Sequence, residues 1–190
     1  TSAKGSPCSA PAGSTCAWKL KQSGNDCLII DKEKFPRKKL CAGWITPQVM
    51  KDLEIDPAGY PCSLLTFDRL NFHIYGLKLE RANIQFAAMN LKLAIGRAGV
   101  PLHVHKVEKI IKEDGYYIID GQFRCRYLVG AGGTFCPVYK SFFETNNPRA
   151  ESSLVVSIEE EFTYDYQDKN CHLWFFENKL PGYAWYVPKG

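Results

Sequence analysis

Residues near the start of the chain have the types and spacing of a site for the pyrophosphate and ribose of a dinucleotide. Ala12, Gly13 and Ser14 lie at the start of an expected helix, where free N–H groups and the helix dipole hold phosphate. Asp31 follows about 20 residues later, where an acid accepts hydrogen bonds from ribose hydroxyls. Of the pattern G-x-G-x-x-G only the third glycine, Gly13, is present. Any βαβ unit with an acid after a strand therefore explains the pattern equally well.

A basic loop, residues 32–43, follows this acid directly. Arg37 and Lys38 carry charge that would neutralise a pyrophosphate, and the run Cys41–Ala42–Gly43 would bring backbone close to a ring system. Lys32, next to Asp31, is a further cofactor-binding candidate. Trp44 comes immediately after this run. A solvated basic loop is the simpler interpretation on charge alone, and the position after Asp31 favours the cofactor.

A second glycine-rich stretch, residues 127–134, follows an expected apolar strand. Gly130 and Gly132 would place backbone amides at the carboxyl edge of a sheet, where nucleotides bind in open α/β folds. A tight turn after a core strand explains the same residues equally well.

The last ten residues, 181–190, are rich in aromatic side chains, proline and glycine. Pro181, Tyr183, Trp185 and Pro188, together with the aromatic run Trp174–Phe175–Phe176, would form the wall of a pocket for a long apolar substrate. The alternative is an ordinary edge of a strand-rich core.

Other chemistries have little support. His103 and His105 share one face of a strand, but no third ligand is close in sequence, so we expect no metal site. The sequence contains no G-x-S-x-G nucleophile elbow. With 24 basic and 20 acidic residues interspersed, the net charge of +4 indicates no nucleic-acid partner.

Composition is that of a globular protein. The apolar fraction is 45%, and no apolar run approaches the ~20 residues that span a bilayer. Without a charged-then-apolar leader we expect a cytoplasmic location, with peripheral membrane contact left open. The eight cysteines lack zinc-knuckle spacing, and we expect them to be reduced and mostly structural. Oligomeric state is not indicated by the sequence.

The expected elements alternate between helices and strands. Helices are predicted at 11–24, 46–53 and 86–97. Strands are predicted at 27–31, in a pair around Gly76 within 67–79, and at 102–107, 109–112, 116–119, 123–129, 154–162 and 171–177. Tight turns are predicted at 113–115 and 120–121.

Taken in order, these segments resemble the geranylgeranyl-reductase family of FAD-dependent oxidoreductases. The residues that carry the resemblance are Pro11–Thr15 with Asp31–Gly43, the run Leu128–Gly133, and P-x-Y-x-W-x-V-P at 181–188. The resemblance implies an α/β (α+β) fold of the p-hydroxybenzoate-hydroxylase type. An incomplete Rossmann-like FAD-binding domain (1–60 and 98–150) would carry an antiparallel β substrate-binding sheet (61–97 and 151–190).

The resemblance also implies roles for individual residues. Residues 12–14 would lie under the pyrophosphate and Asp31 would hold the ribose. Arg37, Cys41, Ala42 and Trp44 would line the flavin, Val104 or His105 would offer backbone to the adenine, and Gly130 and Gly132 would belong to the second FAD motif. Tyr183 and Trp185 would line a tunnel for a polyprenyl lipid whose double bonds are reduced through FAD, with NAD(P)H or ferredoxin as electron donor.

Three departures from the family pattern shape the expectation. The first strand and the first two glycines are missing before Pro11, residues 84–90 contain no arginine, and the chain ends before the family's later Gly-Asp segment. We therefore expect a piece of such an enzyme. A flavin monooxygenase or halogenase on the same scaffold is one alternative, and a cofactor-free binding module is another.

Overall fold

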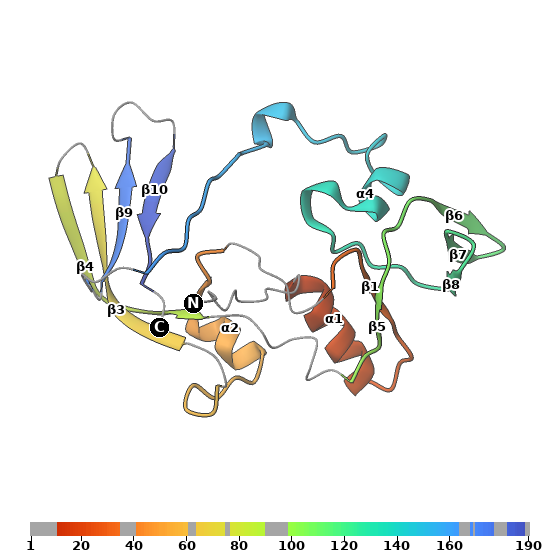
Figure 1. Cartoon of the computed structure of the whole chain (residues 1–190), viewed down its shortest axis with the longest axis horizontal. Helices are drawn as coiled ribbons and strands as arrows, with labels where there is room; N and C mark the ends of the chain where they lie inside the picture. The colour runs from red at the N-terminus through yellow and green to blue at the C-terminus, as the bar shows by residue number, and fades with distance from the viewer. Residues whose placement is uncertain are drawn as a thin grey trace. The chain divides into compact units, whose positions relative to one another are not determined.

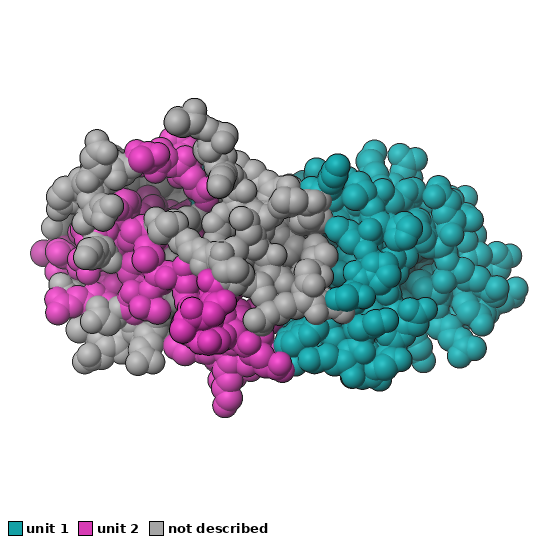
Figure 2. Space-filling model, turned by 60° about the horizontal axis from the view of Figure 1, so that its bottom comes forward, with its two compact units in different colours: residues 1–39, 92–159 teal, residues 40–91, 160–190 magenta. Residues whose placement is uncertain are grey.

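The chain was studied as a computed structural model that describes residues 11–34, 41–60, 64–74, 77–89, 99–163, 168, 170–176 and 182–188. It divides into two units, each made of two stretches of chain (Figure 2). Unit 1 comprises residues 1–39 and 92–159, and unit 2 comprises residues 40–91 and 160–190. The expected residues Arg37, Lys38 and Pro181, and the segment before Pro11, lie outside the described residues.

Unit 1 begins with a helix followed by a parallel pair of strands (Figure 1). Helix α1 spans Pro11–Gln22 and ends where Gly24 takes a positive φ of 78°, as the sequence predicts. Strand β1 (Ile29–Asp31) pairs in parallel with β5 (Leu102–Val104). Ala17 and Val100 form a small buried cluster under the helix. All three residues of β1 are half-buried and two of the three residues of β5 are exposed, so this sheet is less buried than the apolar run 27–30 predicts.

The second half of unit 1 is an antiparallel meander with a short helix packed on it. Strands β6 (Ile110–Glu113), β7 (Tyr116–Ile119) and β8 (Phe123–Cys125) are joined by the two predicted turns. Asp114 and Asp120 both have a φ of 48°, and each is followed by a glycine, which explains why the turns are so tight. Helix α4 (Pro137–Phe142) covers a core that includes Ile110 and Ile119. Two 3₁₀ turns, Gly133–Phe135 and Glu151–Ser153, flank this helix.

Unit 2 is built on one five-stranded sheet with the order β10-β9-β3-β4-β2. Its elements are β2 (Trp44–Ile45), α2 (Pro47–Asp52), β3 (Leu64–Ile74), β4 (Leu77–Met89), β9 (Cys171–Phe175) and β10 (Tyr183–Tyr186). The hairpin β3–β4 confirms the predicted pair of strands around residue 76, and α2 confirms the predicted short helix. Phe67 and Cys171 form the buried centre, with Trp44, Leu65, Leu70 and Val187 packed around them.

Three expectations about these elements are wrong. The sheet of unit 2 was expected to be antiparallel, and it is mixed. Strand β3 pairs in parallel with β9, and the other three pairs of neighbouring strands are antiparallel. The helix predicted at 86–97 fails at its start, since residues 86–89 belong to β4 and pair with β3 from Leu64 to Phe67. Alanine and methionine favour helix locally, and hydrogen bonding along a long hairpin overrides that preference.

The third error is the strand predicted at 154–162. Residues 154–163 have no regular secondary structure, and Val155 and Val156 are 88% and 91% exposed. A β-branched pattern becomes a strand only when another strand takes up its N–H and C=O groups, and no strand in the described residues pairs with this one. The strand predicted at 123–129 likewise stops at Cys125, where its pairing with β7 ends.

None of the described helices is long and apolar enough to cross a bilayer. The described cysteines, at positions 16, 27, 41, 125, 136 and 171, are all thiols.

The burial of Cys171 gives a testable prediction. This side chain is fully buried, and burial raises the pKa of its thiol to about 12, whereas Cys41 is exposed. Because only the thiolate is nucleophilic, about one Cys171 in ten thousand is reactive at pH 8. Iodoacetamide at pH 8 should therefore alkylate Cys41 in the folded protein and leave Cys171 unmodified, as read by peptide mass spectrometry. Both should react in guanidinium, and equal labelling of the two in native protein would contradict the packing described here.

Candidate functional site

The two glycine-bearing segments that the sequence singled out meet in unit 1. A β-carbon placed on Gly13 would lie 3.1 Å from the β-carbon of Ala131, so the first turn of α1 and the glycine-rich stretch are in close contact. A side chain larger than hydrogen at position 13 would push these segments apart. The neighbouring Ser14 is 2% exposed, and its hydroxyl donates to the carbonyl of Pro11 at 3.1 Å. Ala12 is exposed at the helix start, and its side chain offers no hydrogen-bonding group.

The glycines of the second stretch are required by local packing. A β-carbon on Gly130 would lie 2.9 Å from Val138 and 3.0 Å from the Cys136 sulfur. One on Gly132 would lie 3.0 Å from the Cα of Cys136. Both Cys136 and Val138 are buried at the start of α4. These glycines therefore let residues 128–132 fold tightly against α4, and their own surfaces remain exposed.

Asp31 lies at the carboxyl end of β1, where a ribose-binding acid is expected. Its Oδ1 accepts the backbone N–H of Glu33 at 2.9 Å, which fixes the side chain in a short turn. The described residues direct no hydrogen bond to Oδ2, so that oxygen can accept from another donor. Lys32, next in sequence, is largely exposed and lies 3.9 Å from a Glu33 oxygen. This part of the candidate site therefore has the Asp31 carboxylate in a fixed orientation and the Lys32 ammonium group on the next residue.

Val104 and His105 lie beside this acid on the neighbouring strand. Val104 pairs with Asp31 in the parallel register, and the backbone N–H of His105 donates to the Asp31 carbonyl at 2.8 Å. The amide of His105 is thus already used within the sheet. The side chain of Val104 is more than half exposed.

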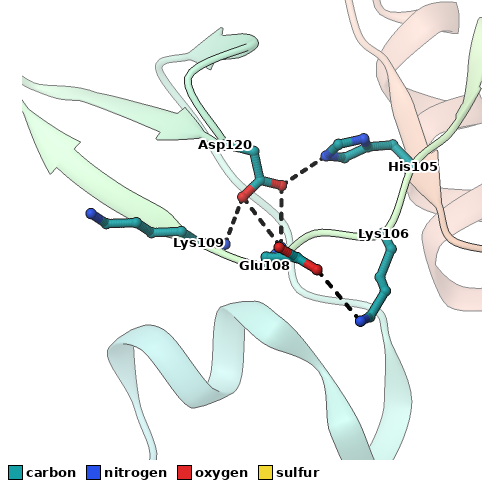
Figure 3. Close-up of polar contacts among 5 residues, drawn as sticks. All are labelled: His105, Lys106, Glu108, Lys109 and Asp120. Atoms are coloured by element: carbon teal, nitrogen blue, oxygen red, sulfur yellow. Dashed lines mark hydrogen bonds and ion pairs between the residues drawn. The ribbon is translucent and has the colours of Figure 1, made fainter.

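The side chain of His105 belongs to a polar network centred on Asp120 (Figure 3). His105 Nε2 lies 2.7 Å from one Asp120 oxygen, and the backbone N–H of Lys109 donates to the other at 2.6 Å. The N–H of Glu108 also points at this carboxylate, 3.1 Å from Oδ2. The hydrogen bonds from His105 and then Lys109 lower the pKa of Asp120. One carboxylate therefore connects the irregular segment between β5 and β6 to the turn between β7 and β8.

The remaining flavin-side residues lie in unit 2. Cys41 is exposed and Ala42 half-buried, in the stretch leading into β2. Trp44 is half-buried and packs against the core of Phe67 and Cys171. The indole of Trp44 thus contributes to the centre of the unit 2 sheet.

The expected substrate wall forms a row of aromatic rings on one face of the unit 2 sheet. Tyr183 stacks on Phe175 with ring centroids 5.5 Å apart, and Trp185 lies tilted to Tyr183 at 5.8 Å. Phe175 in turn stacks on Phe72 of β3 at 6.2 Å. Pro188 follows β10 and is half-buried. Tyr183 remains half exposed, so the row offers apolar surface to a ligand.

Sequence reasoning missed one contributor to these features, Asp120. It was expected only as a turn residue, although its position before Gly121 and 15 residues after His105 is compatible with a returning hairpin. Phe175 belongs to the aromatic run that the sequence suggests for the wall, but the sequence does not predict which ring lies against it. The register that places it opposite Tyr183 depends on pairing between β9 and β10.

The Asp120 network predicts a pH-dependent loss of stability. Asp120→Asn should lower the melting temperature, because an amide replaces the ionised acceptor of two backbone N–H groups and His105. The pKa of Asp120 is lowered in the folded state, so its contribution is present above the unfolded value and is lost as pH falls through the folded one. The difference between wild type and variant should therefore stay constant at neutral pH and shrink as the pH falls below about 4.

The matched control is Asp114→Asn. Asp114 has the same φ and also precedes a glycine, but the residues that the structure describes donate no hydrogen bond to its side chain. Thermal melts of the two variants at several pH values separate the network from turn propensity. Equal effects of the two substitutions would refute the role assigned to Asp120.

Comparison with known proteins gives a partial match to a longer protein. No protein-family model matches the chain. An uncharacterized protein of Methanosarcina barkeri (strain Fusaro) is 31% identical over 193 residues, covering 94% of this chain and 49% of that relative. The chain thus spans about half the length of the curated relative it matches. Among solved structures, flavin-dependent brominase Bmp2 is similar with a TM-score of 0.42 and 19% identity over 64% of this chain and 33% of that one. A triple mutant of the same brominase has a TM-score of 0.41 and 21% identity over 64% of this chain and 34% of its own.

Proposed function

We propose that this chain binds FAD and belongs to a flavin-dependent oxidoreductase that reduces double bonds of a polyprenyl lipid. The observation that carries the proposal is the close contact between Gly13 and Ala131, with Asp31 at the end of the adjacent strand β1. Two motifs with more than a hundred residues between them, each of which suggests a nucleotide site, come together around one helix start.

The residues present fit the adenosine half of the cofactor. The first turn of α1 provides backbone N–H groups with no acidic side chain in that turn to compete for them. Gly13 keeps the backbone accessible at this end, and Asp31 Oδ2 would accept a ribose hydroxyl. Lys32 would add a positive charge close to the phosphates. When bound, the flavin supplies the hydride chemistry.

The lipid substrate is supported by the aromatic row of unit 2. Tyr183, Phe175 and Phe72 present contiguous ring surface, which suits an extended apolar chain better than a charged ligand. The protein's part in the reaction would be to hold that chain straight and to exclude water from it. NAD(P)H or ferredoxin would supply electrons, with the membrane as the source of the lipid and a cytoplasmic location for the protein.

A flavin monooxygenase or halogenase on the same scaffold is the second candidate. Its acceptor would also be an apolar or aromatic molecule lying on the row of rings. The two candidates differ in the oxidant of the reduced flavin, which is the prenyl alkene in one and molecular oxygen in the other.

Cofactor binding is tested with Asp31→Ala. Loss of a hydrogen bond from a ribose hydroxyl to a charged carboxylate should weaken FAD binding by about 10- to 100-fold, measured by quenching of flavin fluorescence. Asp26→Ala is the control, because Asp26 is exposed in the loop before β1. Wild-type protein that stays colourless and takes up no added FAD would refute the flavoprotein proposal and favour a cofactor-free binding module.

Substrate class is tested separately with reduced, FAD-loaded protein. Under anaerobic conditions a geranylgeranyl lipid should reoxidise the bound flavin, and Tyr183→Ala should slow this several-fold by removing half-exposed ring surface. Phe143→Ala, which removes an exposed aromatic ring after α4 in unit 1, should have little effect. Reoxidation that requires oxygen and halide would instead identify the halogenase.

A further inference from the structure

The aromatic row of unit 2 continues across the sheet onto strand β4. Strands β10, β9, β3 and β4 are consecutive neighbours in the sheet and lie side by side in Figure 1. In the hairpin of β3 and β4, Leu77 pairs with Ile74 and Leu79 pairs with Phe72. Because directly paired residues point to the same face of a sheet, both leucines lie on the face that bears the aromatic rings.

This face consists of two rows of side chains, and each row takes one residue from each of the four strands. With neighbouring strands about 4.8 Å apart, a row is about 14 Å long from β10 to β4. None of the side chains in the two rows carries a charge. From β10 to β4, one row is Tyr183, Phe175, Ile74 and Leu77, and the other is Trp185, Leu173, Phe72 and Leu79.

The polar residues of the same strands lie on the opposite face. Lys78 stands between the two leucines in sequence, so its side chain points away from them. Lys78 pairs with His73, and His73 Nε2 lies 2.8 Å from His172 Nδ1. The alternation of residues along the hairpin therefore keeps these polar groups away from the two apolar rows.

The exposed part of the apolar face is concentrated at its two edges. Tyr183 of β10 is 53% exposed, and Leu77 and Leu79 of β4 are 69% and 56% exposed. Between the edges Phe175 is half-buried under its stacked neighbours, and Leu173 is 5% exposed. Exposed leucines that are scattered singly need no explanation, but these two form one continuous surface with the aromatic row.

The size of this surface favours a thin ligand over a second copy of the chain. Only three of the eight residues are more than half exposed. An aromatic residue has at most about 250 Å² to bury, so these three leave roughly 450 Å² open. A standard protein interface buries about 800 Å² on each partner. A single extended hydrocarbon chain needs no more than the strip that is open here.

We propose that the lipid chain lies across the four strands, and that Leu77 and Leu79 bind its far part and determine which chain length binds best. This inference rests on the proposed function, because it takes a polyprenyl chain as the ligand. Tyr183 and Phe175 contact the nearer isoprene units of any chain. A chain of two isoprene units is shorter than the face, whereas a chain of four units extends from β10 to β4.

The test compares the affinities of geraniol, with two isoprene units, and geranylgeraniol, with four, by their effect on tryptophan fluorescence. Combined Leu77→Thr and Leu79→Thr substitution should weaken geranylgeraniol binding about tenfold, because the two leucines together contribute roughly 50 Å² of apolar contact. Binding of geraniol should change by less than twofold. Threonine retains the preference for strand, and both positions are exposed, so we expect the variant to fold.

The matched control is Lys78→Thr. Lys78 lies between the two leucines on the same strand, is exposed, and points to the opposite face, so its substitution should leave both affinities unchanged. Equal effects of the double substitution on the two alcohols, or no effect on either, would overturn the role of Leu77 and Leu79 and leave the proposed function standing. Wild-type protein that binds neither alcohol would contradict the lipid substrate itself.

Two further measurements separate the remaining outcomes. Geranylgeraniol that carries a photoreactive diazirine at its hydrocarbon end should label β4 in wild-type protein, and labelling confined to other strands would overturn the proposal without any variant. Size-exclusion chromatography tests the second copy as occupant. A wild-type dimer that becomes a monomer on substitution of both leucines would mean that a second chain covers them, and would overturn the lipid site on β4.

Discussion

The parallel pairing of β3 with β9 is the interaction on which unit 2 depends. It joins residues 70–74 to residues 171–175, and so brings the two stretches of chain that make up the unit into one sheet. Cys171 becomes fully buried at this junction, against Phe67. Successive side chains of β3 and β9 point to opposite faces of the sheet, so the two faces carry different residues. One face bears aromatic rings, and the other bears the hydrogen-bonded histidines.

Unit 1 depends on constraints of a different kind. A buried core under α4 holds its antiparallel meander, and individual polar or steric contacts connect the other segments, among them Asp120 and the close approach of Gly13 to Ala131. Asp120, whose backbone has a positive φ in its turn, accepts hydrogen bonds from three donors. Only a small buried cluster lies beneath α1, so there such contacts carry a large share of the positioning.

The prediction from sequence succeeded where local chemistry decides the structure. Helix α1 with its glycine stop, the two Asp-Gly turns and the hairpin around residue 76 were all expected at nearly their observed positions. The prediction failed for segments whose secondary structure depends on whether another strand pairs with them. Residues 86–89 became strand because β3 lies beside them, and residues 154–162 did not because no described strand does. The residues of the proposed nucleotide site were chosen by type and spacing, and the packing of Gly130 and Gly132 against α4 could not be predicted from the sequence.

The sequence by itself determined helix α1, the two Asp-Gly turns and the hairpin around residue 76, and it supplied the residue types at the helix start, at Asp31 and in the closing aromatic segment. It also fixed which side chains share a face of a strand, since that alternation is a property of the extended backbone. Only the tertiary structure decided which strands are neighbours. That choice places Tyr183 against Phe175 and His73 against His172, because the register of strands distant in sequence is set by the packing of the whole sheet and by no single segment.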